Sequence, residues 1–389
     1  MSFATQYTQF FNRDNNFNLP PRPRGPQGPV GSTGSTGDNA QTWQLFSSLN
    51  YLPENTGNTT SFIDNLNNNF NKWNGGVLAN NGLIYGVPHD DSRVLIINPN
   101  NKSLSYIQTY DTNANKWQGG VLANNNYLYC IPRGATYILK VDTIGNTLGR
   151  IYDQGLTGSD KWTGGVLSLD GRVFGMPQGA TSILVINPSN DGVSYITGVT
   201  TPNNFFGGAL GADGKIYSYS YDNTGNSMLI IDIVGNTFSK ISTPTPNSRY
   251  VGSVLGSNGF IYGIPNDGNT YLEYNPIGNT FRDVNVGVLI TNSYEGGNLA
   301  QNGKIYCIPS GETRVLVINT DGITYGSTFL FGPNIVGAAL GSKKWKGGVL
   351  AKNGKIYGIP ADAIRVLEIN TGLPSNVNNW SIDAYFNKL

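Results

Sequence analysis

An aromatic residue recurs seven times along the chain, each time two positions before a glycine. The seven are Trp73, Trp117, Trp162, Phe205, Tyr250, Tyr294 and Trp345. A basic residue precedes five of them, namely Lys72, Lys116, Lys161, Arg249 and Lys344. Flat aromatic rings beside polar donors can bind sugars, and seven copies would make such binding multivalent. The alternative is that each ring packs between neighbouring repeats, since a repeat protein needs the same core contact in every unit.

A second group of aromatic residues interrupts the fourth copy of the repeat. Tyr217, Tyr219 and Tyr221 stand where the other copies end in a Gly-Ile-Pro-like sequence. A departure from the repeat can mark a binding site or reflect drift, and we predict from this cluster a ligand-contact patch.

The remaining reactive side chains give little support for catalysis. His89, the single histidine, is followed by Asp90 and Asp91, which would suit half of a general-base site or a carboxylate pair for a cation. No catalytic or EF-hand motif accompanies them, so we interpret this segment as a solvated loop. Cys130 and Cys307 occupy equivalent positions in two repeats that are not neighbours, and we expect both to be small buried residues. We therefore predict no catalytic residue, no metal site and no cofactor.

The elements that position these residues are shaped by an unusual composition. The chain has 389 residues, of which only 13% are charged, about half the usual share of about 25%. Asparagine supplies much of the polarity with 50 residues, beside 51 Gly and 20 Pro, which favours turns over helices. A net charge of +1 gives no electrostatic footprint for nucleic acid. No apolar run approaches the length of a membrane-spanning helix, so we expect no membrane insertion.

Seven copies of one unit account for most of the chain. Two of them read KWNGGVLANNGLIYGVP from Lys72 and KWKGGVLAKNGKIYGIP from Lys344. One leucine of the unit falls at Leu78, Leu122, Leu167, Leu210, Leu255, Leu299 and Leu350, at intervals of 43 to 51 residues. Periods of this length are typical of repeat architectures.

Within each unit the pattern is that of short antiparallel strands. Asn-Gly or Asp-Gly follows the first apolar run in most copies and predicts a two-residue hairpin turn. The next run ends at proline, a third ends in Asn or Asp, and a weaker fourth leads into the following copy. Four strands every 44 residues or so form one blade of a β-propeller. We predict an all-β, seven-bladed β-propeller of four-stranded antiparallel blades over residues 41–389.

Closure of the ring requires a strand from one end of the chain. The segment Gly57-Asn58-Thr59 matches the start of fourth strands such as Gly235-Asn236-Thr237. We therefore predict that residues 57–66 supply the outer strand of the last blade, which would remove an open sheet edge. The competing candidate is the tail at 378–386.

The first 40 residues differ from the rest. Glycine falls at every third position from Gly25 to Gly37, which is the collagen pattern, and we predict an extended collagen-like stalk over 21–40. A flexible Gly/Ser/Pro linker is the alternative. A triple helix would make the protein a homotrimer, with residues 1–20 as an anchoring segment.

The unit KWxGGVLAxNGKIYGIP resembles repeats found in proteins of giant DNA viruses and of assorted microbes. A Gly-X-Y segment joined to a globular head is similar to viral surface fibres. The resemblance implies a non-enzymatic fibre or spike on the virion surface, held by its N-terminus to a capsid or other virion protein. Its propeller head would bind a host surface receptor, protein or glycan. The alternatives are a propeller scaffold for protein–protein interaction in a microbial cytoplasm and, less favoured, a propeller enzyme.

Overall fold

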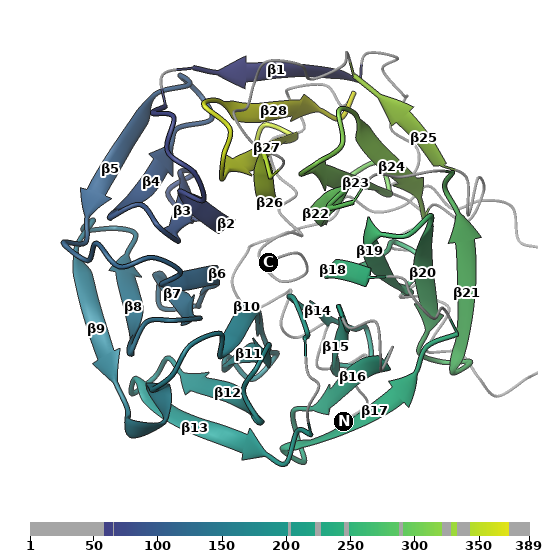
Figure 1. The fold of residues 1–389 in the computed structure, drawn as a ribbon, viewed down its shortest axis with the longest axis horizontal. Helices are drawn as coiled ribbons and strands as arrows, with labels where there is room; N and C mark the ends of the chain where they lie inside the picture. Colours follow the sequence, from purple (N-terminus) through teal and green to yellow (C-terminus); the bar gives the residue numbers. More distant parts are fainter. Residues whose placement is uncertain are drawn as a thin grey trace, which may run out of the picture. The chain divides into compact units, whose positions relative to one another are not determined.

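The computed structural model describes residues 58–64, 66–200, 204–221, 227–244, 249–287, 291–320, 328–332 and 343–372. These residues form 28 strands in seven four-stranded antiparallel sheets, which stand as blades around a common axis (Figure 1). The predicted all-β, seven-bladed propeller is thereby confirmed. The predicted segments 1–20 and 21–40, and the tail at 378–386, lie outside the described residues.

The four strands of a blade run from the axis outward in chain order. The innermost strands are β2 (Trp73–Leu78), β6 (Trp117–Leu122), β10 (Trp162–Leu167), β14 (Ala209–Leu210), β18 (Arg249–Leu255), β22 (Tyr294–Leu299) and β26 (Trp345–Leu350). The second strands are β3 (Ile84–Pro88), β7 (Tyr127–Pro132), β11 (Val173–Pro177), β15 (Ile216–Tyr219), β19 (Ile261–Asp267), β23 (Lys304–Pro309) and β27 (Lys355–Pro360).

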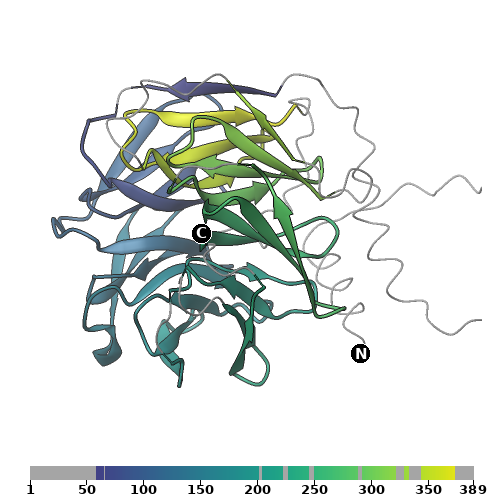
Figure 2. The same cartoon turned by 45° about the vertical axis from the view of Figure 1, so that its right-hand side comes forward.

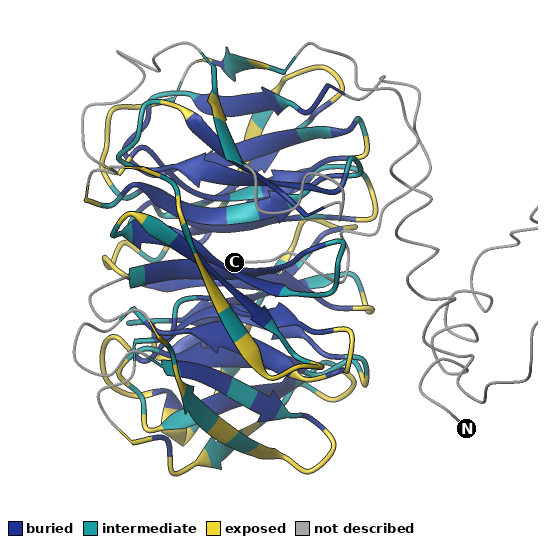
Figure 3. Cartoon of the chain, turned by 90° about the vertical axis from the view of Figure 1, so that its right-hand side faces the viewer, coloured by how far each residue is buried: buried dark blue, intermediate teal, exposed yellow. Residues whose placement is uncertain are grey.

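The outer half of each blade is built in the same way. The third strands are β4 (Arg93–Ile97), β8 (Tyr137–Asp142), β12 (Ser182–Asn187), β16 (Ser227–Asp232), β20 (Thr270–Asn275), β24 (Val315–Asn319) and β28 (Val366–Asn370). The outer strands of blades 1 to 6 are β5 (Leu104–Gln108), β9 (Leu148–Tyr152), β13 (Gly192–Thr197), β17 (Thr237–Ser242), β21 (Thr280–Asn285) and β25 (Thr328–Phe331). The core lies between neighbouring blades, and exposed residues gather on the outer strands and turns (Figure 3).

The seventh blade takes its outer strand from the other end of the chain. β1 (Thr59–Ile63) pairs antiparallel with β28, with Ser61 opposite Glu368. β1 is therefore the outer strand of the last blade, the role that the match with other fourth strands predicted for residues 57–66. The outer edge of β28 is covered by this strand.

Glycine in the inner strands allows neighbouring blades to approach closely. A Cβ atom at Gly120 would lie 2.9 Å from Val87 Cγ2 of the preceding blade and 2.6 Å from Leu128 Cδ1. Both distances are shorter than atoms in contact tolerate. The Gly-Gly pattern thus reflects crowding near the axis.

Asparagine side chains link neighbouring blades on one face of the propeller. This face carries the turn between the first and second strands of each blade, and we call it the bottom face. Asn81 Oδ1 accepts a hydrogen bond from Leu83 N and so closes its own turn, while Asn81 Nδ2 donates to Thr143 O of the next blade at 2.7 Å. At the equivalent position Asn125, Asn302 and Asn353 make the same bond to a turn carbonyl of the following blade. In blades 3 and 5 the donors come from nearby positions of the turn, Arg172 and Ser257. This repeated bond explains part of the high asparagine content.

The opposite face, where the inner strands begin, we call the top face. It carries the turns between second and third strands and the connections from each outer strand to the next blade (Figure 2). Among the described residues, no helix is long and apolar enough to cross a membrane.

Candidate functional site

The seven repeated aromatic rings lie in the core at the top face. Their exposed fractions are all 2% or less, for Trp73, Trp117, Trp162, Phe205, Tyr250, Tyr294 and Trp345. The four tryptophans donate from Nε1 to the backbone carbonyls of Arg93, Tyr137, Ser182 and Arg365 at 2.7 to 3.0 Å. Their contacts here are those of packing, and sugar binding by these rings stays a prediction.

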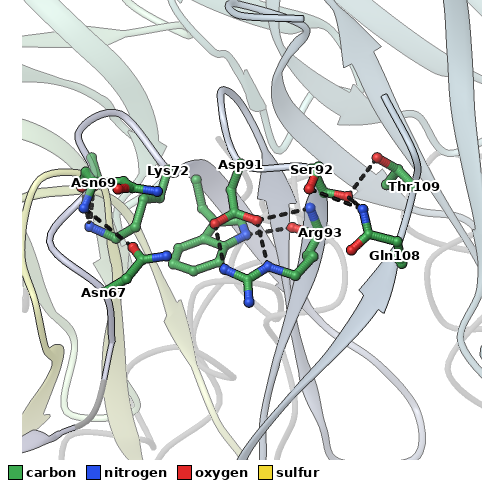
Figure 4. A network of polar contacts seen from close by, with 10 residues as sticks. Asn67, Asn69, Lys72, Asp91, Ser92, Arg93, Gln108 and Thr109 are labelled. Carbon is green, nitrogen blue, oxygen red and sulfur yellow. Dashed lines mark hydrogen bonds and ion pairs between the residues drawn. The ribbon is translucent and has the colours of Figure 1, made fainter. Parts of the chain in front are cut away.

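Three of the four lysines before the tryptophans bond to the preceding blade through their side chains. Lys72 Nζ donates to Ala361 O of blade 7 at 2.8 Å and to Asn69 O at 2.7 Å (Figure 4). Lys161 and Lys344 bond in the same way to Ala135 O and Gly311 O of the blades before them. Burial lowers the pKa of Lys72, Lys161 and Lys344 to about 8.

The tyrosine cluster of blade 4 divides between core and surface. Tyr217 donates to Asp213 and Tyr219 donates to Ile261 O, and both side chains are buried. Tyr221 is half-buried, its ring 5.0 Å from that of Phe206 and 5.0 Å from the guanidinium carbon of Arg249. Only Tyr221 of the three therefore reaches the top face.

One position of the top face carries a different residue in every blade. It aligns with the residue after the proline of the repeat, at the end of the second strand, and its occupants are His89, Arg133, Gln178, Tyr221, Asn266, Ser310 and Ala361. In six blades the backbone N–H at this position donates to the backbone carbonyl of the residue before the core aromatic ring, so the local backbone conformation is repeated. A constant backbone with a variable side chain is the arrangement by which repeat proteins build binding surfaces. Alignment of the seven copies shows this variation. We did not predict a site here, because we looked for residues that recur in the repeat and not for positions that vary.

Arg133 joins three consecutive blades at this position. Its Nη1 lies 3.2 Å from His89 Nε2 of blade 1, and its Nε donates to Gln178 Oε1 of blade 3 at 3.2 Å. Nη1 also donates to Asn115 Oδ1, and Nη2 lies 2.6 Å from Asp160 Oδ1. The side chain of Arg133 remains 22% exposed. We call Arg133, His89, Gln178, Asn115 and Asp160 the Arg133 cluster.

The protonation of the cluster follows from burial and charge. Burial, with Lys346 and Arg133 nearby, lowers the pKa of His89 despite the neighbouring Asp90. A neutral imidazole can accept a hydrogen bond at Nε2 from Arg133. Burial would raise the pKa of Asp90, but His89 and the N–H of Asn115 outweigh it and lower the pKa. His89 Nδ1 lies 2.8 Å from Asp90 Oδ1, outside hydrogen-bonding geometry.

The neighbouring turn of blade 1 is held by a separate pair. Asp91 accepts from Nε and Nη2 of Arg93, both at 2.8 Å, and Thr109 Oγ1 donates to Ser92 O at 2.7 Å (Figure 4). The segment from His89 to Asp91, expected to be a solvated loop, is instead largely buried, because its groups are bonded to adjacent strands and blades.

The arrangement suits recognition of a polar or charged group. Arg133 offers a partly exposed guanidinium fork beside the amide of Gln178, and both act as hydrogen-bond donors. In the part of the chain that the structure describes, no three His, Cys, Asp or Glu side chains gather as a metal site would require. Cys130 and Cys307 are buried free thiols, and burial raises the pKa of each.

Known proteins share the fold but not the sequence. No family model matches the chain, and no curated protein does. A streptogramin B lyase structure is 13% identical, with a TM-score of 0.67, and covers 82% of this chain and 99% of its own. Virginiamycin B lyase from Staphylococcus aureus is 12% identical, with a TM-score of 0.66, covering 81% and 99%. The extracellular domain of a one-component system from B. thetaiotaomicron is 13% identical, with a TM-score of 0.60, covering 80% and 39%.

These similarities correct one prediction. We expected from the architecture that the chain is not an enzyme. That prediction is wrong as a conclusion from the fold, because lyases have the same fold. That expectation also depended on a scarcity of convergent titratable groups, whereas His89, Asp90 and Asp160 gather around Arg133. At 11–13% identity the similarity to the lyases concerns the fold alone.

Proposed function

We propose that the propeller is a recognition domain that binds its ligand on the top face, over blades 2 to 4. The observation that carries this proposal is the position at the end of the second strand, where seven different side chains occur and six of them share the same backbone hydrogen bond. Arg133, Gln178 and Tyr221 are the members of that set that reach solvent in consecutive blades. Loops held by a rigid scaffold are the usual site of binding.

The chemistry of this surface favours a ligand with a polar or anionic group beside an apolar or aromatic one. Arg133 and Gln178 supply hydrogen-bond donors, and Tyr221 with Phe206 supplies aromatic area. Tyrosine and arginine are enriched among the residues that dominate binding energy at interfaces.

The wider role that we propose is attachment. The propeller would be the head of a virion surface fibre, trimeric through the Gly-X-Y run and held to a capsid or other virion protein by its N-terminus. The occurrence of the same fold in extracellular sensor domains supports a role in recognition outside the cell. A scaffold in a microbial cytoplasm is the second candidate, and the Gly-X-Y period favours the fibre, because a scaffold does not need it.

Binding can be tested with the labelled full chain on immobilised glycans and cell-surface proteins. We expect at least one ligand whose signal falls roughly tenfold in Arg133→Ala and in Tyr221→Ala. Lys215→Ala removes an exposed positive charge from the bottom face and serves as the matched control. A ligand bound equally well by both top-face variants would contradict the proposal.

The fibre role has its own test, the solution mass of the full chain. Sedimentation should give three chain masses if the Gly-X-Y run forms a triple helix. A monomer would contradict the stalk without affecting the recognition face.

A further inference from the structure

We propose that the outer rim of blades 1 and 2 carries a saccharide-binding platform formed by Tyr110, Tyr152, Arg150 and Asp111. This platform shares no residue with the Arg133 cluster, and it does not depend on the function proposed for the top face. It also differs from the seven core rings that the sequence pointed to, because its rings are open to solvent.

Exposure of the aromatic rings is the first observation. Tyr110, two residues beyond β5, is 84% exposed, and Tyr152, the last residue of β9, is 65% exposed. Tyr106, in the middle of β5, is 37% exposed but stands opposite Leu95 on the side of blade 7. The other large exposed apolar side chains of the described residues are Phe70, Ile144, Val234, Ile277 and Leu330, none of them in β5, β9 or the turn that follows β5. Tyr110 and Tyr152 thus form a local concentration of aromatic surface.

The backbone of Tyr110 is the second observation. Its φ is +60°, a left-handed conformation that is costly for a residue with a large side chain. The other non-glycine residues with positive φ among those described are asparagines, aspartates and Lys102. The equivalent residue in blade 5 is Gly287, whose φ is +90°. The two positions are equivalent because the preceding residues, Thr109 and Val286, each donate a backbone hydrogen bond to the residue before the third strand of their blade. A tyrosine in a position suited to glycine indicates a use for its ring.

Contacts between blades 1 and 2 hold the platform together. Tyr137 OH donates to Asp111 Oδ2 at 2.7 Å, and Arg150 Nη2 donates to Thr109 O at 3.3 Å, so both neighbours of Tyr110 are bound by blade 2. The ring of Tyr152 lies 5.6 Å from that of Tyr137, and the Arg150 guanidinium lies 4.7 Å over the same ring.

Tyr106 does not belong to the platform, because it lies on the other face of blade 1. It stands opposite Leu95, which packs toward blade 7, and its ring stacks on Trp73 at 6.1 Å. The platform is therefore confined to the groups held between blades 1 and 2, which is a preorganised arrangement.

The chemistry of these groups matches a sugar ring. A pyranose presents a C–H face that can stack on an aromatic ring and hydroxyl groups that need both donors and acceptors at its edge. Tyr110 and Tyr152 supply the faces, Arg150 the donors and Asp111 the acceptor. Hydrogen bonds from Tyr137 and Asn113 help to lower the pKa of Asp111 against the effect of burial, which keeps its carboxylate charged. A stable protein partner would need about 800 Å² on each side, more than two tyrosines and their neighbours provide.

The test is a glycan array of defined oligosaccharides probed with the labelled full chain, followed by titration of the strongest saccharide. Tyr110→Gly is the informative variant, because it removes the ring while glycine accepts the positive φ at no steric cost. We expect its melting temperature to equal or exceed that of the wild type, and its affinity to fall roughly tenfold. Tyr152→Ala should weaken binding similarly, whereas Ile144→Ala, which trims an equally exposed side chain in blade 2, should not.

Several results would overturn the proposal. They are the absence of any saccharide bound by the wild type, unchanged affinity in Tyr110→Gly and Tyr152→Ala, and a large fall in the melting temperature of Tyr110→Gly, which would make the ring structural. Loss of saccharide binding in Arg133→Ala with retention in Tyr110→Gly would assign the sugar to the Arg133 cluster instead. If the Arg133 cluster binds a protein, Arg133→Ala should abolish that binding and Tyr110→Gly should leave it unchanged. Failure of the saccharide platform can therefore be distinguished from failure of the function proposed for the top face.

Discussion

Ser61 Oγ donates a hydrogen bond of 2.8 Å to Oε1 of Glu368, although the two residues are 307 positions apart in the chain. Glu368 is buried and also accepts from Lys355 Nζ at 2.9 Å, Lys102 Nζ at 3.1 Å and Tyr357 OH at 3.0 Å. The carboxylate thus joins the first strand, two strands of the last blade and a turn of blade 1. It stabilises the closure of the ring.

Glu368→Gln should destabilise the propeller by about 3 kcal/mol, because it leaves two lysines facing a neutral amide. Ser61→Ala should cost less, since it removes one hydrogen bond. Ser239→Ala is the matched control, because Ser239 holds the same register in blade 4 opposite Ile230. Equal melting temperatures for Glu368→Gln and the wild type would contradict this role of the carboxylate.

The same carboxylate predicts loss of stability in acid. Burial would raise the pKa of Glu368, but hydrogen bonds from Lys355, Ser61 and Lys102 outweigh it and lower the pKa to about 2. The unfolded chain therefore takes up this proton first, so the stabilisation is present above about pH 4.5 and is lost as the pH falls toward 2. Melting temperatures between pH 6 and 3 should fall less steeply in Glu368→Gln.

Asn81→Asp separates the bond that Oδ1 accepts within the turn from those that Nδ2 donates to Tyr85 OH and to Thr143 O. Aspartate keeps the oxygen that closes the turn with Leu83 but cannot donate to Thr143 O of the next blade. We expect a loss of about 1–2 kcal/mol in chemical denaturation. Asn101→Asp is the control, because Asn101 Oδ1 accepts from Ser103 N in a similar turn on the exposed surface. Equal losses in both variants would show that the bond between blades contributes nothing.

Gly120→Ala should destabilise the protein by about 1–3 kcal/mol, because the added methyl group would overlap Leu128 and Val87. Gly149→Ala is the matched control on an outer strand, where the nearest atom to the new Cβ lies at 3.7 Å. Thermal unfolding of both variants measures the difference. A destabilised Gly149→Ala beside an unaffected Gly120→Ala would contradict the close approach of blades 1 and 2.

His89 predicts a second pH dependence at milder acidity. Burial lowers its pKa in the folded protein, so the unfolded chain protonates first, near pH 6.5. The stability contributed by the neutral imidazole is therefore present above pH 6.5 and is lost below it. His89→Gln should flatten the dependence of melting temperature on pH between 7 and 5. An unchanged slope would place the sensitivity elsewhere.

The architecture could be predicted because hairpin turns and apolar runs recur at a fixed period. The segment Gly57-Asn58-Thr59 even indicated the strand that the structure places beside β28. The site was harder to predict, because an aromatic ring that recurs with the fold has the same sequence signal whether it packs or binds. Trp73 lies in the core and Tyr110 on the surface, and only the backbone conformation and exposure distinguish them.

The most direct test of the recognition face is hydrogen exchange of the full chain with and without the strongest ligand from the glycan and protein screen. We expect slower exchange in the turns that follow β7, β11 and β15, around Arg133, Gln178 and Tyr221. Protection confined to the bottom face, or no change in these three turns at saturation, would contradict it.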